Sequence, residues 1–169
     1  PHCVVKKLVL SLGDVPQTGR STCLEVLQGV LRERSVPNLR LHTDASQPVG
    51  PGRSRFLDLS GGWLADDFIG WLDVSALVLL DVATGEGQEF LDFYANSELP
   101  EMLAEIDATV TLVTSVSEDV DSEHFLRVAA ETLRDDAEYV VVRGPGHDGW
   151  QSTACERANC SSSVEPVSA

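Results

Sequence analysis

Residues 13–22 combine the residue types that bind phosphate groups. The apolar run 8–12 leads into a turn-rich loop, and the loop ends in Gly19-Arg20-Ser21-Thr22 just before a helical pattern begins. In such an arrangement, backbone N–H groups of the loop and the N-terminus of the helix form a cradle for anionic phosphates. The order strand, loop, helix therefore predicts a phosphate-binding loop of the P-loop type.

This loop departs from the P-loop pattern G-x-x-x-x-G-K-[ST] at two of its defining positions. Asp14 stands where the pattern has its first glycine, and Arg20 stands where it has lysine. Asp14 adds negative charge next to the phosphates, and Pro16 removes one N–H donor from the cradle. Arg20 still supplies a cation, although its forked guanidinium is bulkier than an ammonium group. An ordinary strand–turn–helix connection is the alternative interpretation.

If the loop binds a nucleotide, its last residues have expected places. Gly19 gives the backbone room to turn beneath a phosphate, Ser21 offers its hydroxyl to Mg²⁺, and Thr22 reaches the α-phosphate. The predicted nucleotide-binding residues are Asp14, Val15, Pro16, Gln17, Thr18, Gly19, Arg20, Ser21 and Thr22.

Two aspartates follow other predicted strands at positions that suit this chemistry. Asp81 ends the run 76–80, where a carboxylate can hold the hydration shell of Mg²⁺, so we expect Ser21 and Asp81 to be the metal ligands. Asp44 follows the run 39–43 and could position attacking water, so we expect Asp44 and Arg20 to carry catalysis. The alternatives are a turn-capping role for Asp81 and an Asx turn at Asp44.

Apolar runs and amphipathic segments alternate along the chain, which predicts an α/β fold. The continuous apolar run 76–80 is typical of a strand buried on both faces of a parallel sheet. We expect three layers, α/β/α, with a mainly parallel sheet and with the loop, Asp44 and Asp81 at the carboxyl ends of strands, where such sheets bind ligands. Strands are predicted over 4–11, 39–43, 56–59, 76–80, 109–114 and 139–143, and helices over 20–34, 63–72, 87–95, 100–106, 121–133 and 149–158.

Two finer predictions concern the helices. Cys23, Val26, Leu27 and Val30 fall on one stripe of the first helix, and Asp121 is placed to act as an N-cap of the helix over 121–133.

The composition limits the classes of partner. The net charge is −15 and the isoelectric point is near 4.4, so we expect neither non-specific DNA binding nor membrane binding. The acidity serves solubility alone or matches a basic partner protein. No apolar stretch is long enough to cross a bilayer, and the cysteine spacings fit no zinc site, which favours a cytoplasmic protein with free thiols.

The chain resembles the ParA/MinD group of P-loop ATPases, within the SIMIBI class, and is most similar to their plasmid-stability and mobilisation branch, the StbB-like proteins. The resemblance covers about residues 6–158. It rests on segments that occur in the same order and at similar spacing as in that family: Lys7–Asp14, Thr43–Ser46, Leu79–Asp81, Val110–Thr114 and Tyr139–Arg143.

The resemblance implies a P-loop NTPase-like domain over residues 1–158 that binds ATP and Mg²⁺, with weak hydrolysis, and serves plasmid maintenance, partition or conjugal mobilisation. It also implies a homodimer, and the acidic surface is expected to meet a basic DNA-binding partner protein. Residues 159–169 are small and polar and are expected to form a disordered tail.

Two lysines that act in the loop of that family correspond here to Val15 and Arg20. The alternative function is therefore a catalytically dead pseudo-ATPase that serves as a protein-interaction module. A small-molecule kinase on the same scaffold would rest on analogy of fold alone.

Overall fold

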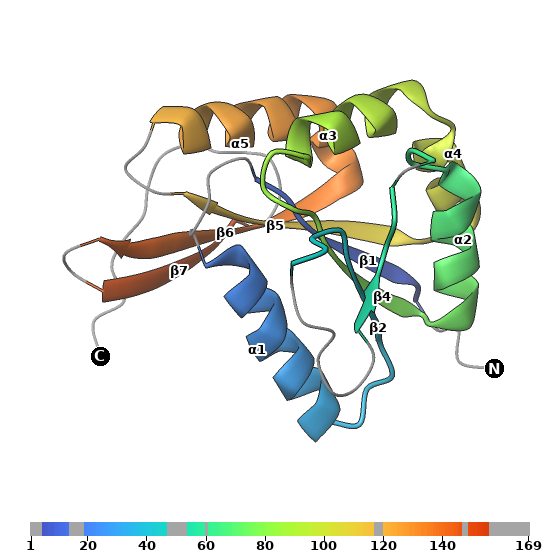
Figure 1. Ribbon diagram of the computed structural model, residues 1–169, viewed down its shortest axis with the longest axis horizontal. Helices are drawn as coiled ribbons and strands as arrows, with labels where there is room; N and C mark the ends of the chain where they lie inside the picture. The colour runs from blue at the N-terminus through green and yellow to red at the C-terminus, as the bar shows by residue number, and fades with distance from the viewer. Residues whose placement is uncertain are drawn as a thin grey trace.

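The computed structural model describes residues 5–13, 19–46, 54–59, 61–116, 120–146 and 149–155. These residues form one seven-stranded sheet in the order β3-β2-β4-β1-β5-β6-β7 (Figure 1). The first six strands in this order are parallel, and β7 runs antiparallel to β6. The strands are β1 (Lys7–Ser11), β2 (Leu39–His42), β3 (Ser54–Phe56), β4 (Leu77–Asp81), β5 (Thr109–Val116), β6 (Ala137–Gly146) and β7 (Gly149–Cys155).

Helices cover both faces of this sheet, which confirms the predicted three-layer α/β/α fold. Helix α1 lies alone on one face in Figure 1, and the remaining α-helices lie on the other face. The helices are α1 (Arg20–Glu33), α2 (Ala65–Val74), α3 (Gly87–Asn96), α4 (Leu99–Glu105), α5 (Val120–Leu133) and the 3₁₀ turn η1 (Arg134–Asp136).

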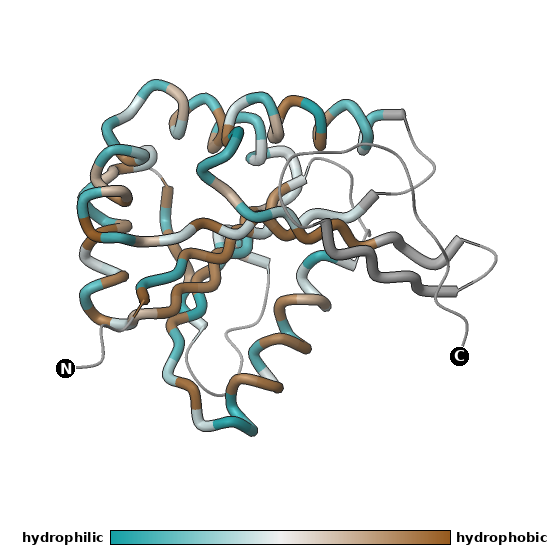
Figure 2. Tube along the Cα trace, turned by 180° about the vertical axis from the view of Figure 1, so that it is seen from behind, coloured by the Kyte–Doolittle hydropathy of each residue, from teal (hydrophilic) through white to brown (hydrophobic). Residues whose placement is uncertain are grey.

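The two central strands are buried on both faces, as their continuous apolar sequences predict. Leu8 and Leu10 of β1 pack into the large core beneath α2–α5, whereas Val9 points to the opposite face and packs with Leu24 of α1. The apolar strands are visible as the brown centre of the trace in Figure 2. Burial of such runs on both faces favours parallel strands between two helical layers.

An aromatic cluster fixes α3 against α2 and the segment that precedes it. Trp63 meets Phe90 edge to face, with ring centroids 5.1 Å apart, and Phe68 lies 5.9 Å from Phe93 in a stacked arrangement. Phe68 and Phe90 are fully buried. Because α3 begins directly after the loop that follows β4, this packing also holds that loop in place.

The prediction of a helix over 149–158 is wrong, since residues 149–155 form β7. β6 is the last of the parallel strands, so without β7 its outer edge would expose unpaired backbone N–H and C=O groups. The chain reverses between Gly146 and Gly149 and pairs with that edge. Trp150 and Thr153 also belong to residue types that favour strands.

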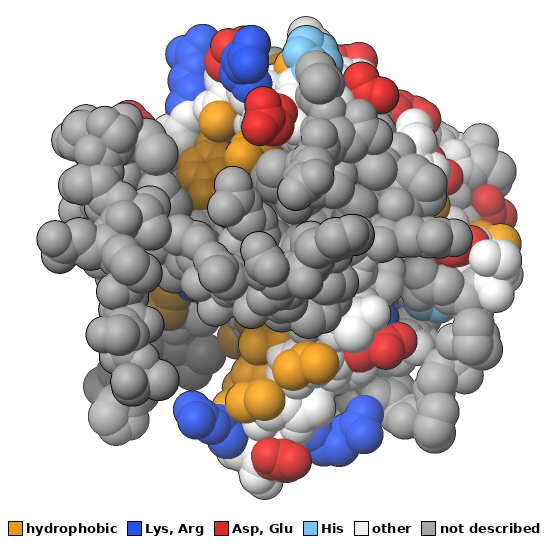
Figure 3. Space-filling model, turned by 90° about the vertical axis from the view of Figure 1, so that its left-hand side faces the viewer, with side chains coloured by type: hydrophobic (Ala, Val, Ile, Leu, Met, Phe, Trp, Pro, Cys, Tyr) orange, Lys and Arg blue, Asp and Glu red, His pale blue; other side chains and the backbone are white. Residues whose placement is uncertain are grey.

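Two further details of the helices differ from the prediction. Helix α5 begins at Val120, so Asp121 lies inside its first turn and is not the N-cap. On α1, Val26 and Val30 are 63% and 40% exposed, and the buried residues of that helix are Arg20, Leu24 and Gln28. Apolar side chains accordingly appear among charged ones in the lower part of Figure 3, at the height of α1. These three inward residues are spaced by four and form one face of the helix.

No helix in the described part of the chain is long and apolar enough to cross a membrane. The predicted disordered tail, residues 159–169, lies outside the described residues.

Candidate functional site

The connections that follow the neighbouring parallel strands β1 and β4 lead to opposite faces of the sheet. β1 is followed by α1 on one face of the sheet, whereas β4 is followed by α3 on the other face. In parallel α/β sheets, ligands bind beyond the carboxyl ends of strands at such a divergence. The carboxyl ends of β1 and β4 therefore define the candidate site.

Arg20 spans this divergence from the first turn of α1. Its side chain is buried, with Nη1 3.5 Å from the carbonyl oxygen of Val82, and Nη2 donates a hydrogen bond of 3.2 Å to Oγ1 of Thr84. Both acceptors lie in the segment that follows β4. The arginine that the sequence placed at the P-loop lysine position therefore connects the start of α1 to the loop beyond Asp81.

Gly13 makes room for this arginine. A Cβ atom on Gly13 would lie 3.0 Å from Nε and 3.2 Å from Cζ of Arg20, tighter than ordinary van der Waals contact. The guanidinium therefore lies directly against the backbone at the end of β1. This close approach is a physical reason for glycine at position 13.

The N-terminus of α1 points into the same region. Gly19 precedes the helix with φ of 81°, in the left-handed region that favours glycine, and it has no side chain with which to cap the helix. The first turn contains no acidic residue. Its N–H groups and the helix dipole can therefore serve an anion. Residues 14–18, the centre of the predicted loop, lie outside the described residues.

A row of buried polar side chains lies at the carboxyl edge of three adjacent strands. Ser11 of β1 and His42 of β2 are both in register with Asp81 of β4. All three are at least nine-tenths buried. Within the described part of the chain, Oγ of Ser11, Oδ2 of Asp81 and Nε2 of His42 make no hydrogen bond. Because buried polar atoms are nearly always hydrogen-bonded, this row is where a polar ligand would find partners.

The orientation of His42 is set by its neighbour. Its Nδ1 lies 3.0 Å from the carbonyl oxygen of Asp44, and because a carbonyl only accepts, Nδ1 carries the hydrogen. The other ring nitrogen, Nε2, is the one that makes no hydrogen bond within the described residues.

Asp81 has a cationic neighbour that the sequence analysis did not identify. Nη2 of Arg40 lies 3.6 Å from Oδ2 of Asp81, a charge contact that exceeds hydrogen-bond length. On its other side, Arg40 donates a 3.3 Å hydrogen bond from Nη1 to Oε1 of Gln28, and its Nη2 lies 3.8 Å from Oε1 of Glu25. The alternation of leucine with polar residues in Leu39–His42, at a strand next to the apolar run 76–80, is the sequence signal that could have revealed it.

Thr43, directly after β2, is hydrogen-bonded to the end of β4 and to the segment that follows it. Its N–H donates to the carbonyl oxygen of Asp81, and its Oγ1 accepts from the N–H of Ala83 at 2.8 Å while donating to Oε2 of Glu86. These bonds fix the segment between β4 and α3, and Glu86 is the N-cap residue of α3. Neither Thr43 nor Glu86 was predicted as a site residue.

Asp44 lies just beyond this bonded group and forms an Asx turn. Its Oδ1 accepts hydrogen bonds from N and Oγ of Ser46, at 2.8 and 2.7 Å. This is the local geometry named above as the alternative for Asp44. Its assignment to catalysis stays a prediction.

The residues around Asp81 do not fit a resident Mg²⁺ ion. The carboxylate already faces a buried arginine, and no group of three or more His, Cys, Asp or Glu side chains suited to a metal occurs among the residues whose positions are described. Ser21, the other predicted ligand, lies partly buried in the first turn of α1, and Thr22 is exposed there.

The structure thus brings Gly19 and Arg20 of the predicted loop to the segment that follows Asp81. It adds to the predicted site four residues that the sequence analysis did not identify: Ser11, Arg40, His42 and Thr43.

Comparisons of the chain with models of protein families and with curated protein sequences found no match.

Proposed function

We propose that this protein binds a nucleotide through its phosphates, at the carboxyl ends of β1 and β4. The observation that carries the proposal is Arg20: a buried guanidinium at the N-terminus of a helix that begins after β1. Its charge and the helix dipole act in the same place, and both favour an anion. Bonds from a guanidinium to phosphate oxygens are among the stronger hydrogen bonds in proteins.

The polar row beside Arg20 supports the same ligand. Phosphate oxygens could accept from the hydroxyl of Ser11, which makes no hydrogen bond within the described residues. The fully buried position of that hydroxyl makes an unpaired state costly, so a ligand that satisfies it gains affinity.

The biological role that we propose is that of a ParA/MinD-like protein in plasmid maintenance, partition or mobilisation. The similarity of residues 6–158 described above supports this role, as does the parallel α/β sheet in which β1 and β4 are neighbours. ATP is the expected nucleotide.

A second candidate, a pseudo-ATPase that serves as a protein-interaction module, is favoured by one specific observation. The guanidinium of Arg20 is turned toward the carbonyl of Val82 and the hydroxyl of Thr84, which both lie in the segment that follows β4. These contacts connect α1 to the segment after β4 without any ligand, which is a structural role that an interaction module would keep.

Titration calorimetry with ATP, ADP and GTP tests the proposal. We expect micromolar binding, and we expect Arg20→Met to weaken it about ten- to a hundredfold, since a hydrogen bond to a charged group contributes about 1.5–3 kcal/mol. Arg127→Met, at an exposed position of α5, is the matched control and should leave the affinity unchanged. Absence of heat at millimolar nucleotide would refute nucleotide binding and favour the interaction module.

A further inference from the structure

We propose that Arg40 takes the place of a metal ion beside Asp81, so that this site binds the metal-free form of its nucleotide. The proposal rests on the proposed function, because it specifies the chemical form of the same ligand. Its basis is the chain of contacts Glu25–Arg40–Asp81 under helix α1.

Arg40 reaches Asp81 from inside the protein. The side chain of Arg40 is 8% exposed and that of Asp81 is 3% exposed, so water screens their charges little. Nη2 lies 3.6 Å from Oδ2, and that oxygen makes no hydrogen bond within the described part of the chain. The guanidinium is therefore the counter-charge of this carboxylate.

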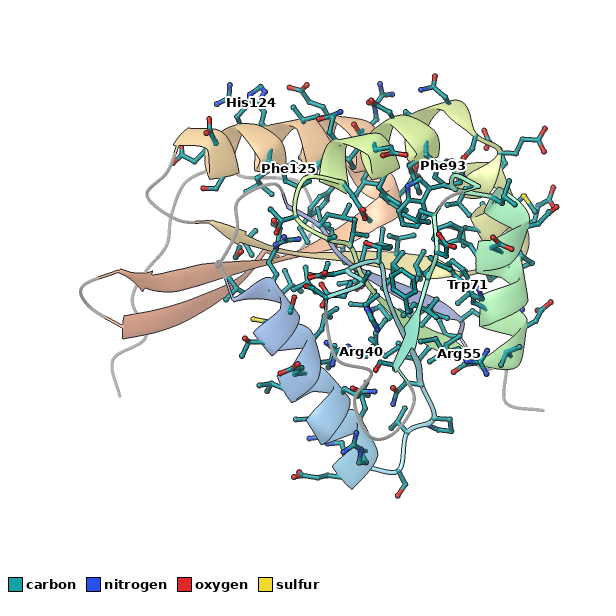
Figure 4. All side chains as sticks on the ribbon, viewed as in Figure 1. Arg40, Arg55, Trp71, Phe93, His124 and Phe125 are labelled. Atoms are coloured by element: carbon teal, nitrogen blue, oxygen red, sulfur yellow. The ribbon has the colours of Figure 1, made fainter. Side chains whose placement is uncertain are left out.

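Arg40 is also held so that it cannot readily leave. Strand β2 places it between β3 and β4, in register with Leu79, on the face that α1 covers. Gln28 accepts from its Nη1 at 3.3 Å, and the carboxylate of Glu25 lies 3.8 Å from its Nη2. In Figure 4 the labelled side chain of Arg40 lies on the α1 side of the sheet.

A divalent cation would have to share Oδ2 of Asp81 with this guanidinium. A cation bound directly or through one water would then lie within a few ångströms of a fixed positive charge in a poorly hydrated place. The like charges repel, and displacing the buried guanidinium would break its hydrogen bond to Gln28. Metal binding at Asp81 is therefore disfavoured in the folded protein.

The ligand follows from the same charges. Two buried arginines flank the place proposed for the phosphates: Arg20 begins α1 after β1, and Arg40 lies within β2 and reaches Asp81 at the end of β4. A nucleotide without Mg²⁺ carries more negative charge than its Mg²⁺ complex. The site should therefore prefer the free nucleotide, in contrast to sites in which the metal bridges phosphate and protein.

Electron paramagnetic resonance of Mn²⁺ tests the protein half of this proposal without any nucleotide. Surface carboxylates of this acidic chain bind some Mn²⁺ in every variant, so the signal is compared between variants, and we expect the wild-type protein to give the same signal as Asp81→Asn. We expect Arg40→Met to reduce the signal, since it removes the competing cation and leaves Asp81. Arg55→Met, on the neighbouring strand β3 and exposed, is the matched control and should behave as wild type. A wild-type protein that binds more Mn²⁺ than Asp81→Asn, or a folded Arg40→Met variant that binds no more than the wild type, would overturn the proposal.

Calorimetry with ATP tests the ligand half. We expect the wild-type dissociation constant in EDTA to equal the value in excess Mg²⁺ or to be lower, and we expect Asp81→Asn to leave this ratio within about twofold of wild type. A wild-type affinity about tenfold higher with Mg²⁺ would overturn the proposal. These wild-type measurements test whether the site prefers the metal-free nucleotide even if Arg40→Met fails to fold. Lack of nucleotide binding under both conditions would refute the proposed function, whereas the Mn²⁺ experiment would still decide the role of Arg40.

Discussion

Replacing Arg40 by methionine should destabilise the folded protein by about 3–5 kcal/mol, the range seen when one partner of a buried ion pair is removed. Both side chains are buried, at 8% and 3% exposure, so the variant leaves the charge of Asp81 without its counter-charge. Oε1 of Gln28 also loses its donor, which adds about 1 kcal/mol. Methionine retains much of the aliphatic volume, so a cavity contributes little. A domain of this size has a total stability of about 5–15 kcal/mol, so the loss is a large part of it.

Urea denaturation followed by circular dichroism measures this effect, with two controls from the same chain. Arg55→Met makes the same change at an exposed position of β3, labelled in Figure 4, and should change the stability by less than about 0.5 kcal/mol. Glu25→Gln removes a carboxylate that is 64% exposed and lies 3.8 Å from Arg40, and should cost less than about 1 kcal/mol.

A double-mutant cycle identifies the source of the loss. Arg40→Met combined with Asp81→Asn removes both charges, so it should cost less than the sum of the single variants. If Arg40→Met costs no more than Arg55→Met, the pair with Asp81 does not stabilise the fold. That result would refute our reasoning about the interior of this site.

Three other predictions follow from the described geometry. Gly13→Ala should weaken nucleotide binding about tenfold in calorimetry, because the added Cβ would lie 3.0 Å from Nε of Arg20. Gly29→Ala is the control, because nothing lies within 4 Å of the Cβ that it adds. It should keep the full affinity for nucleotide and stabilise α1 by about 1 kcal/mol. Phe90→Ala should cost about 3–5 kcal/mol in urea denaturation, because the ring is fully buried in the aromatic cluster. Burial raises the pKa of Tyr94 and of Tyr139 to about 12, so their tyrosinate absorbance should rise only near that pH in the folded protein. Since the folded state holds these protons more tightly than the unfolded state, the free energy of unfolding should fall as the pH rises from about 10 to about 12, and less steeply in Tyr94→Phe.

The local pattern of the sequence was enough to predict most of the elements. The apolar runs around Val9 and Leu79 predicted the two central strands, because a strand buried on both faces needs no polar alternation. The start of α1 at Arg20 was also predicted to the residue, and the end of β4 was predicted one residue early, at Leu80 instead of Asp81. These features depend on neighbours in sequence, since periodicity and turn-forming residues act over a few positions.

Residues 149–155 show what the local pattern could not decide. Their sequence allowed a short helix, and the unpaired edge of β6 made them a strand. Strand pairing depends on a partner elsewhere in the chain, so propensity is overridden when that partner offers unsatisfied backbone groups.

The interior of the candidate site likewise depended on tertiary structure. The sequence by itself determined that Arg20 and Asp81 stand at the ends of a loop and a strand. Only the order of the strands decided that β2 lies beside β4, which brings Arg40 and His42 to Asp81, and only the packing of α1 decided that Gln28 faces inward while Val26 is exposed. The physical reason is that burial and charge pairing are properties of residues brought together from distant parts of the chain, and these contacts exist only once the sheet is assembled.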